Sequence, residues 1–258
     1  MQVYTVCKLL LDYTIKSEYF ATMKIIHHSV SAIWIASMVL LFSACSFKRG
    51  SGNIVSETRN VSSFESIKIS EGIEAFVSNG PLSVRVEADD NLIEYLRTKV
   101  SNGVLKVDLD ITSVDDAHLK VYITAPNIRK IAVSSGAEVE MLNVLKHKDR
   151  IELDASSAAD IQGVVDAPEV ALEASSGAKL DVEGRTRMVK VRSSSGSNID
   201  ASGLLSETAE VRSSSGATAK VYASVQLKAQ ASSGSTINHR GGAQTEIKQS
   251  SGGVVRAD

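Results

Sequence analysis

The sequence predicts an all-β fold, a parallel β-helix or β-solenoid with coils of about 18–22 residues. Three observations predict it. A short phrase recurs at nearly constant spacing, apolar and polar residues alternate on both sides of that phrase, and one position after it is always apolar. A helical fold would need apolar residues at spacings of three and four, which the repeated stretches do not supply.

The recurring phrase is a pair of serines followed by a very small residue. It occurs seven times between Ser134 and Gly252, and the small residues of successive copies are 22, 19, 19, 20, 18 and 18 positions apart. A period of this size is typical of one structural unit stacked on itself. We therefore expect each copy to mark one coil of a solenoid.

Apolar or small residues alternate with polar ones in the stretches that flank each copy. The third position after the small residue is always apolar: Val139, Ile161, Leu180, Ile199, Ala219, Ile237 and Val255. Alternation with a period of two predicts a strand, a bend and a second strand with one face inward. Stacking would then align like residues in internal ladders, for example Leu153, Leu172, Val191 and Val211. Leu172 should be buried and its neighbour Glu173 exposed.

The small residue of each copy is predicted to form the bend, because glycine adopts a positive φ without the strain that a Cβ brings. Ala158 occupies this place in the second copy, which indicates that the corner is not always left-handed. The adjacent serines fit a cramped bend, where hydroxyls can bond the backbone or the next coil. A binding surface of stacked serines is the alternative. The predicted structural corners are Gly136, Gly177, Gly196, Gly216, Gly234 and Gly252.

The N-terminal part of the chain carries the pattern of a bacterial lipoprotein signal. A weakly basic stretch opens at Met23-Lys24, and the uncharged run Val30–Phe42 follows. Ser43-Ala44-Cys45 then resembles a lipobox, in which cleavage precedes a cysteine that becomes acylated. Cys45 is therefore the predicted lipid-attachment residue. Phe42 stands where leucine is usual, so the alternative is a cysteine that lies near an ordinary cleavage site.

Cleavage before Cys45 would remove residues 1–44 and leave a chain with one cysteine, 25 basic and 28 acidic side chains. One cysteine cannot form an intrachain disulfide or a zinc cluster. The charges are mixed along the chain without a basic block, which disfavours binding of nucleic acid. Either Met1 or Met23 could be the start, since no targeting signal needs residues 1–22.

Composition divides the chain into four segments. We expect an upstream segment with the signal peptide (1–44), a flexible tether (45–60), one solenoid domain (61–252) and a C-terminal tail (253–258). Within the solenoid, irregular first coils at 61–132 precede the serine–glycine repeat coils at 133–252.

Five alternating stretches of the irregular first coils are predicted strands. Between the third and fourth, Asp89-Asp90-Asn91 precedes apolar residues at Leu92, Ile93, Leu96 and Val100, which predicts a short amphipathic helix with an acidic start. Ser101-Asn102-Gly103 then returns the chain to a strand. The five stretches are Glu65–Ser70, Ile73–Ser78, Leu82–Ala88, Val104–Ile111 and Leu119–Ala125.

Motifs of the first coils resemble those of one family, the "putative auto-transporter adhesin, head GIN domain", which is common in surface and periplasmic proteins of Bacteroidota. The resemblance covers about residues 61–252 and implies a right-handed β-solenoid and secretion. Glu74 stands where the family's name residue, Asn, is usual, and no activity is tied to that position. The motifs are Phe64-x-x-Ile67, Ser70-Glu71-Gly72-Ile73-Glu74, Val84-x-Val86-x-Ala88-Asp89, Gly103-x-Leu105-x-Val107 and Val121-x-Ile123-x-Ala125-Pro126.

Residues that could carry catalysis are scattered rather than clustered. The three histidines that follow Cys45, His118, His147 and His239, lie far apart without a partner at metal-ligand spacing, and no nucleophile elbow, phosphate loop or cofactor fingerprint is present. Charged residues occupy one position of successive coils, and such a stripe is either a solvated strand face or a surface for a charged polymer. The stripe comprises Asp154, Glu173, Arg192 and Arg212. We predict no catalytic, cofactor or metal site.

Aromatic residues, which commonly stack on sugars in carbohydrate sites, are rare in the repeat coils. Tyr222 is the one aromatic between Ser134 and Asp258. This disfavours a conventional lectin groove on the solenoid. An adhesive surface would then use extended polar contacts, or lie in the first coils near Phe64, Phe76, Tyr95 and Tyr122.

These observations favour a non-enzymatic, lipid-anchored β-solenoid for interactions at the cell envelope or surface, an adhesin-like binding module. It would be exported and held to the outer membrane through Cys45, facing the periplasm or the cell surface. Its expected partners are the membrane and an envelope component, glycan or protein. A structural or self-associating homo-oligomeric scaffold is the alternative, because solenoid ends offer open strand edges. A carbohydrate-active enzyme is less favoured.

Overall fold

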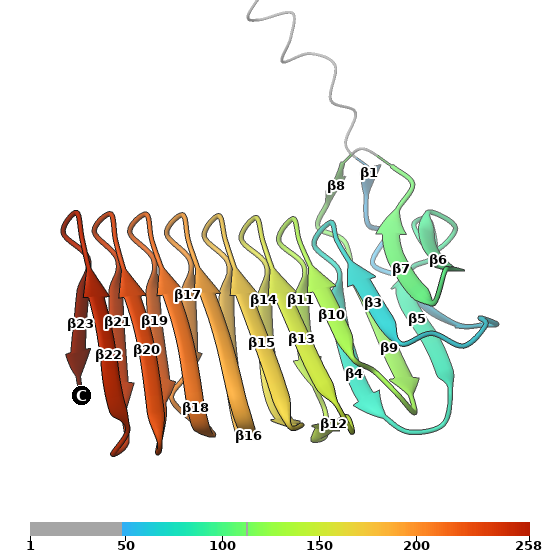
Figure 1. The fold of residues 1–258 in the computed structure, drawn as a ribbon. Coiled ribbons are helices and arrows are strands. Elements are labelled where there is room, and N and C mark those ends of the chain that lie inside the picture. Colours follow the sequence, from blue (N-terminus) through green and yellow to red (C-terminus); the bar gives the residue numbers. More distant parts are fainter. Residues whose placement is uncertain (1–47, 112) are drawn as a thin grey trace, which may run out of the picture. The chain divides into compact units, whose positions relative to one another are not determined.

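The computed structural model describes residues 48–111 and 113–258, and every regular element in them is a β-strand (Figure 1). One network of hydrogen bonds joins 21 of these strands, and β1 (Lys48–Arg49) pairs separately with β8 (Val114–Asp115). The all-β solenoid that the sequence predicts is confirmed. The signal-peptide prediction and Cys45 lie outside the described residues.

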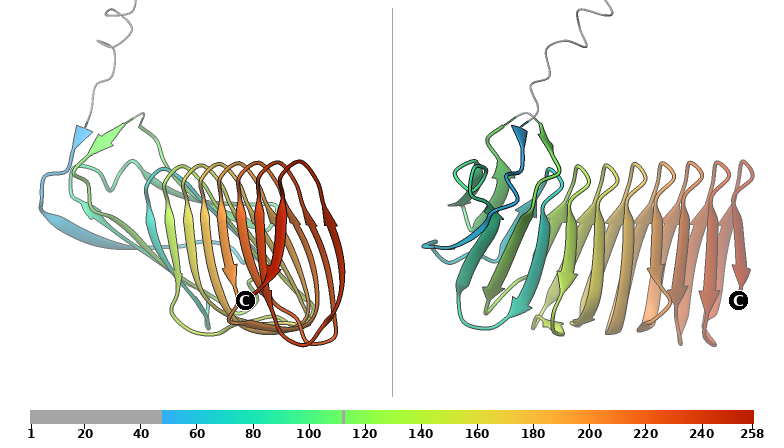
Figure 2. Two further views of the ribbon diagram at one scale, coloured as in Figure 1. Left: turned by 90° about the vertical axis from the view of Figure 1, so that its left-hand side faces the viewer. Right: turned by 180° about the vertical axis from the view of Figure 1, so that it is seen from behind.

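Each repeat coil has one strand before the serine–glycine corner and one after it, and a second bend leads to the next coil (Figures 1 and 2). The strands before the corner stack in parallel. They are β10 (Lys130–Val133), β13 (Arg150–Ala155), β15 (Glu169–Ala174), the second half of β16 (Lys179–Ser193), β18 (Leu204–Ser213), β20 (Gln226–Ala231) and β22 (Gln244–Gln249).

The strands after the corner form the second parallel stack. They are β11 (Glu138–Met141), β14 (Asp160–Asp166), the first half of β16, β17 (Asn198–Ala201), β19 (Thr218–Tyr222), β21 (Thr236–Arg240) and β23 (Val254–Ala257). The short β12 (Leu145–Lys146) pairs with the end of β14. The predicted tail at 253–258 is therefore wrong, because β23 pairs with β21 as part of the last coil.

The core consists of the predicted ladders of like residues. Leu172 pairs in register with Leu153 on one side and Val191 on the other, and Val191 pairs with Val211. These four side chains are at most 1% exposed, whereas Glu173 is exposed. Ile161, Leu180 and Ile199 form the matching ladder after the corner. Both ladders are confirmed, and each fully buried leucine in them contributes about 1.5–3 kcal/mol of burial free energy.

The first coils do not stack in sequence order. The coil of β3 (Ser66–Ile69) and β4 (Glu74–Asn79) pairs with β10 and β11 on one side. Its other side pairs with β7 (Val104–Leu109) and β9 (Leu119–Ala125), so the later coil is the outer one. The chain therefore forms the coil of β3 and β4 first, then the outer coil of β7 and β9, and then returns to place β10 beside β3.

Antiparallel strands cover the outer coil, and we name them the antiparallel cap. β5 (Ser83–Asp89) pairs with β9, β2 (Ile54–Arg59) pairs with β5, and β6 (Leu96–Ser101) pairs with β7. The predicted short helix is wrong. Only one turn forms, with amide hydrogen bonds from Leu92 and Ile93 to the carbonyl of Asp89, because the following residues pair with β7 as a hairpin strand. The hairpin turn at Asn102-Gly103 has two positive φ angles, of 51° and 73°.

The predicted tether at 45–60 is also wrong over its described part, because the segment that leads into β2 is held by Asp89-Asp90-Asn91. The buried Asp89 carboxylate accepts hydrogen bonds from the amides of Gly52 and His118, both at 2.7 Å. Asp90 accepts from the Ser51 hydroxyl at 2.6 Å and the Asn53 amide at 2.8 Å. The glycine and serine residues of this segment therefore lie where the chain is closely packed, and they do not form a flexible linker.

Candidate ligand-binding groove

The serine–glycine corners are rigid structural turns. The second serine and the following small residue both have positive φ, as in Ser195 (52°) and Gly196 (70°), which is the pattern of a type I′ turn. Ala158 has a φ of 60°, so the expectation that this corner departs from the left-handed form is wrong. The predicted glycines Gly136, Gly177, Gly196, Gly216, Gly234 and Gly252 have φ angles of 69–75°.

Hydrogen bonds between coils use the backbone of these corners. The amide of each small residue donates to the carbonyl of the second serine in the next coil, for example from Gly177 to Ser195 at 3.1 Å and from Gly196 to Ser215 at 3.0 Å. Glu71-Gly72 begins this ladder, with the Gly72 amide 3.0 Å from the Ser135 carbonyl oxygen. The geometry supports the structural interpretation of the serine–glycine repeats.

The charged stripe is a solvated strand face, on which Asp154 and Arg212 form ion pairs. Asp154, Glu173 and Arg192 share one register, and Arg212 follows. Lys130 of the neighbouring coil lies 2.6 Å from Asp154 and 2.8 Å from Glu152. The hydrogen bond from Lys130 lowers the pKa of Glu152. These contacts join adjacent coils, and Lys130 bridges and neutralises the carboxylates of Glu152 and Asp154.

Of the four aromatic residues predicted as an adhesive surface in the first coils, one is buried and three are half-buried. Phe64 is buried, and Phe76 stacks on Tyr122 with 5.0 Å between ring centroids. Arg85 lies over the Tyr122 ring and Lys48 over the Tyr95 ring, at 4.0 and 3.9 Å. Phe76, Tyr95 and Tyr122 thus each have a ring or a cation against one face, which reduces the surface on which a sugar could stack.

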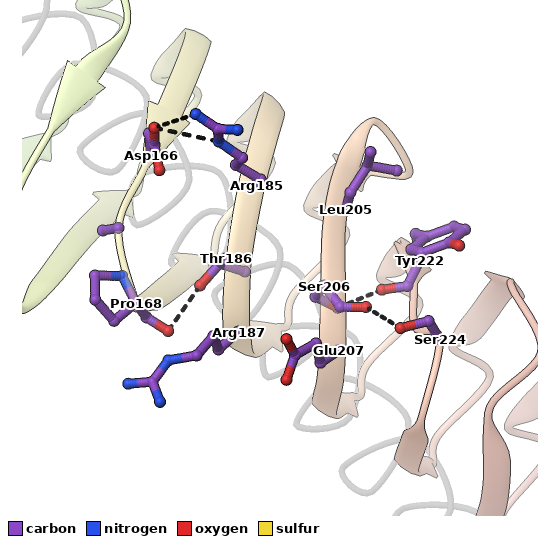
Figure 3. A pocket seen from close by; sticks show the side chains of 11 residues that line it. Asp166, Pro168, Arg185, Thr186, Arg187, Leu205, Ser206, Glu207, Tyr222 and Ser224 are labelled. Atoms are coloured by element: carbon purple, nitrogen blue, oxygen red, sulfur yellow. Dashed lines mark hydrogen bonds and ion pairs between the residues drawn. The ribbon is translucent and has the colours of Figure 1, made fainter.

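A hollow lies at the second bend of the repeat coils, on the side opposite the serine–glycine corners. It has a volume of about 540 Å³ and crosses four successive coils (Figure 3). Each coil contributes one short segment to the wall. The segments are Asp166–Pro168, Arg185–Arg187, Leu205–Glu207, and Tyr222 with Ser224. We name this hollow the second-bend groove.

The floor of the second-bend groove is held by small hydroxyl side chains. The buried Thr186 hydroxyl donates to the Pro168 carbonyl at 3.1 Å, the Ser206 hydroxyl to the Tyr222 carbonyl, and the Ser224 hydroxyl to the Ser206 carbonyl at 3.3 Å (Figure 3). These bonds run from coil to coil. The groove is therefore formed before any ligand arrives.

The rim of the groove mixes apolar and charged groups. Leu205 is 56% exposed, and Arg185 forms an ion pair with Asp166 at 3.0 Å. Arg187 and Glu207 are exposed and form no ion pair with any residue in the described part of the chain. The two arginines and two carboxylates give the rim no net charge. It offers hydrogen-bond donors and acceptors beside an apolar surface.

The described residues hold no group of three or more His, Cys, Asp or Glu side chains suited to a metal ion. The three histidines take separate structural places. His118 lies 4.0 Å from Glu87, the His147 ring nitrogen accepts the amides of Asp149 and Arg150, and His239 pairs in register with Val221. Across residues 48–111 and 113–258, no helix could span a membrane.

Comparison with protein families gives one match. The model of the "Putative auto-transporter adhesin, head GIN domain" family matches residues 63–243, which is more than half of the chain. The chain belongs to this family. The resemblance of the first-coil motifs is thereby confirmed, and the match extends through the serine–glycine coils as far as residue 243, before the last copy at Ser250-Ser251-Gly252.

Solved structures share the fold of this GIN domain. A putative adhesin from Bacteroides fragilis aligns with a TM-score of 0.73 and 18% identity over 81% of this chain and 98% of that one. A putative adhesin from Parabacteroides distasonis gives 0.71 and 19% over 83% and 100%. A putative lipid binding protein from the same species gives 0.69 and 15% over 83% and 100%. No curated protein matches the chain.

Sequence reasoning missed the second-bend groove in this GIN domain. The signal was present in Tyr222, the single aromatic of the repeat coils, which we interpreted as evidence against a sugar site. The four segments that form the wall of the second-bend groove share no motif, because each coil differs in length and composition at this bend. Only the coil-to-coil register aligns them.

Proposed function

We propose that this protein is a non-enzymatic binding module of the bacterial cell envelope, exported and held to the outer membrane by a lipid on Cys45. Its GIN-domain membership supports this, since the family and its solved neighbours are described as putative adhesins or a lipid binding protein, not as enzymes. The single observation that carries the binding role is the preformed second-bend groove, which crosses four successive coils of the solenoid.

The anchor is supported by the lipobox-like sequence before Cys45 and by the position of the fold in the chain. Residues 46–47 alone separate Cys45 from β1, which opens the described domain. A lipid on Cys45 would thus be attached close in sequence to a folded segment. Exposure on the cell surface or in the periplasm is decided by protease treatment of intact cells.

We expect Cys45→Ala to release the protein from the membrane fraction and to abolish its labelling by a fatty-acid analogue, because the thiol is the acylation site. Cell fractionation and in-gel detection of the labelled protein measure both effects. Cys7→Ala is the matched control and should change neither. Labelling that persists in Cys45→Ala would contradict the anchor, while the binding role would still stand.

A self-associating scaffold is the second candidate, favoured by the coil of β22 and β23. Ile247 and Val254 there are 40% and 42% exposed, although Ile247 continues the buried ladder of Val211 and Ala229. If this coil joins a second copy, the weight-average mass in light scattering should rise with protein concentration, and Ile247→Lys should suppress the rise. A constant monomer mass across the series would contradict it.

A further inference from the structure

We propose that the second-bend groove binds a linear, uncharged glycan that lies along the stack of coils. The inference rests on the proposed binding role and names the ligand class. Its apolar platform is formed by Tyr222 and Leu205, and its polar contacts come from Arg187 and Glu207. Sugars fit such a surface because one face of the ring is apolar while the hydroxyl groups both donate and accept hydrogen bonds.

Tyr222 is the aromatic residue of the repeat coils, and it lies in the wall of the second-bend groove. The Phe76, Tyr95 and Tyr122 rings each have a cation or a second ring against them. No cation or ring stacks on Tyr222 within residues 48–111 and 113–258, and its side chain is half-buried in the groove wall (Figure 3). The ring of Tyr222 thus places a half-buried aromatic surface in the second-bend groove.

The charge balance of the rim favours a neutral ligand. Asp166 already neutralises Arg185 at 3.0 Å, and the remaining Arg187 and Glu207 have opposite charges on neighbouring coils. A polyanion would gain attraction from Arg187 and meet repulsion from Glu207, and a polycation would meet the reverse. Hydroxyl groups can bond both side chains without either penalty.

The backbone of the groove is not free to bind a peptide strand. The amide of Arg187 donates to the Pro168 carbonyl at 3.2 Å, and that of Ser224 to the Ser206 carbonyl at 3.1 Å. Addition of a peptide strand requires an unpaired edge, and these amides are already paired between coils. Recognition therefore falls to side chains spaced at one strand separation, roughly 4.8 Å per coil. A linear polymer along the stack can contact several of them in succession.

The test is fluorescence anisotropy of the purified full chain with labelled linear hexasaccharides of glucose, mannose and xylose, and with hexagalacturonate as the anionic comparison. We expect at least one neutral probe to bind, and Tyr222→Ala to weaken it by about tenfold or more. Tyr222→Phe should keep affinity within about threefold, because the ring is retained. Arg187→Ala should weaken binding. Arg192→Ala is the matched control, because Arg192 lies in the same strand but outside the groove, and it should leave binding unchanged.

Thermal unfolding of every variant confirms that the coils remain folded. The proposal is overturned if no neutral hexasaccharide binds, if Tyr222→Ala binds like the unsubstituted protein, or if hexagalacturonate binds more tightly than every neutral probe. These outcomes are separate from failure of the envelope role, which the Cys45→Ala fractionation decides. A protein that remains in the envelope and binds none of the probes would refute the glycan groove alone.

Discussion

Leu172→Asp is expected to unfold the middle coils of the solenoid. Leu172 is 1% exposed and lies in register between Leu153 and Val191, so the new carboxylate would be surrounded by aliphatic side chains on both neighbouring coils. The substitution loses the burial of a leucine and introduces an unpaired charge, and together these cost at least about 4 kcal/mol. Circular dichroism during urea unfolding measures the loss.

The adjacent Glu173→Gln is the matched control for this substitution. Glu173 is exposed and forms no ion pair with any residue that the structure describes. We therefore expect a change within about 0.5 kcal/mol. Equal unfolding midpoints for the two variants would contradict the assigned inside and outside faces. Each coil contacts only its neighbours, so the middle coils of the Leu172→Asp variant can unfold before the rest. We therefore expect its urea unfolding, followed by circular dichroism, to occur in two steps.

Gly184→Ala is expected to cost at least about 3 kcal/mol, since the backbone at this bend leaves no room for a Cβ. An ideal Cβ on Gly184 would lie 2.0 Å from the carbonyl oxygen of Val165 in the neighbouring coil, and φ is 117°. The neighbouring coil would have to move away, which breaks the register of β14 and β16 beside the second-bend groove.

The matched control is Gly196→Ala at a serine–glycine corner. A Cβ there meets nothing within 4 Å, so only the strain of a positive φ remains, about 1–2 kcal/mol. Ala158 shows that the stack accepts an alanine at an equivalent corner. Thermal unfolding should place Gly184→Ala clearly below Gly196→Ala, and the reverse order would contradict the contacts described at the two bends.

The sequence predicts the repeat coils closely because every coil must bury one apolar face, and each does so with the same pattern of residues. Alternation around Leu153, Leu172 and Val191 places one apolar side chain inward at a constant distance before the corner. Stacking in register is then the one arrangement that buries all of them at once. Local pattern and tertiary contact agree, so inside and outside could be assigned residue by residue.

Prediction was less successful in the first coils, where pairing partners are not neighbours in sequence. Leu92, Ile93, Leu96 and Val100 are spaced as on a helix, yet the strand from Leu96 pairs with β7 and only one helical turn remains. The Gly50-Ser51-Gly52 segment has the composition of a linker, but Asp89 and Asp90 bind it to the cap. In both places a tertiary contact outweighs the local preference.

The sequence by itself determined the stack of coils, the positions of the corners and the composition of the core, because these depend on a repeated local pattern. The tertiary structure alone decided the order of the first coils, the antiparallel cap and the second-bend groove. The groove arises where Asp166, Arg185, Leu205 and Tyr222, which share no motif, are aligned by hydrogen-bonded register between coils. That register fixes which side chains face a ligand together.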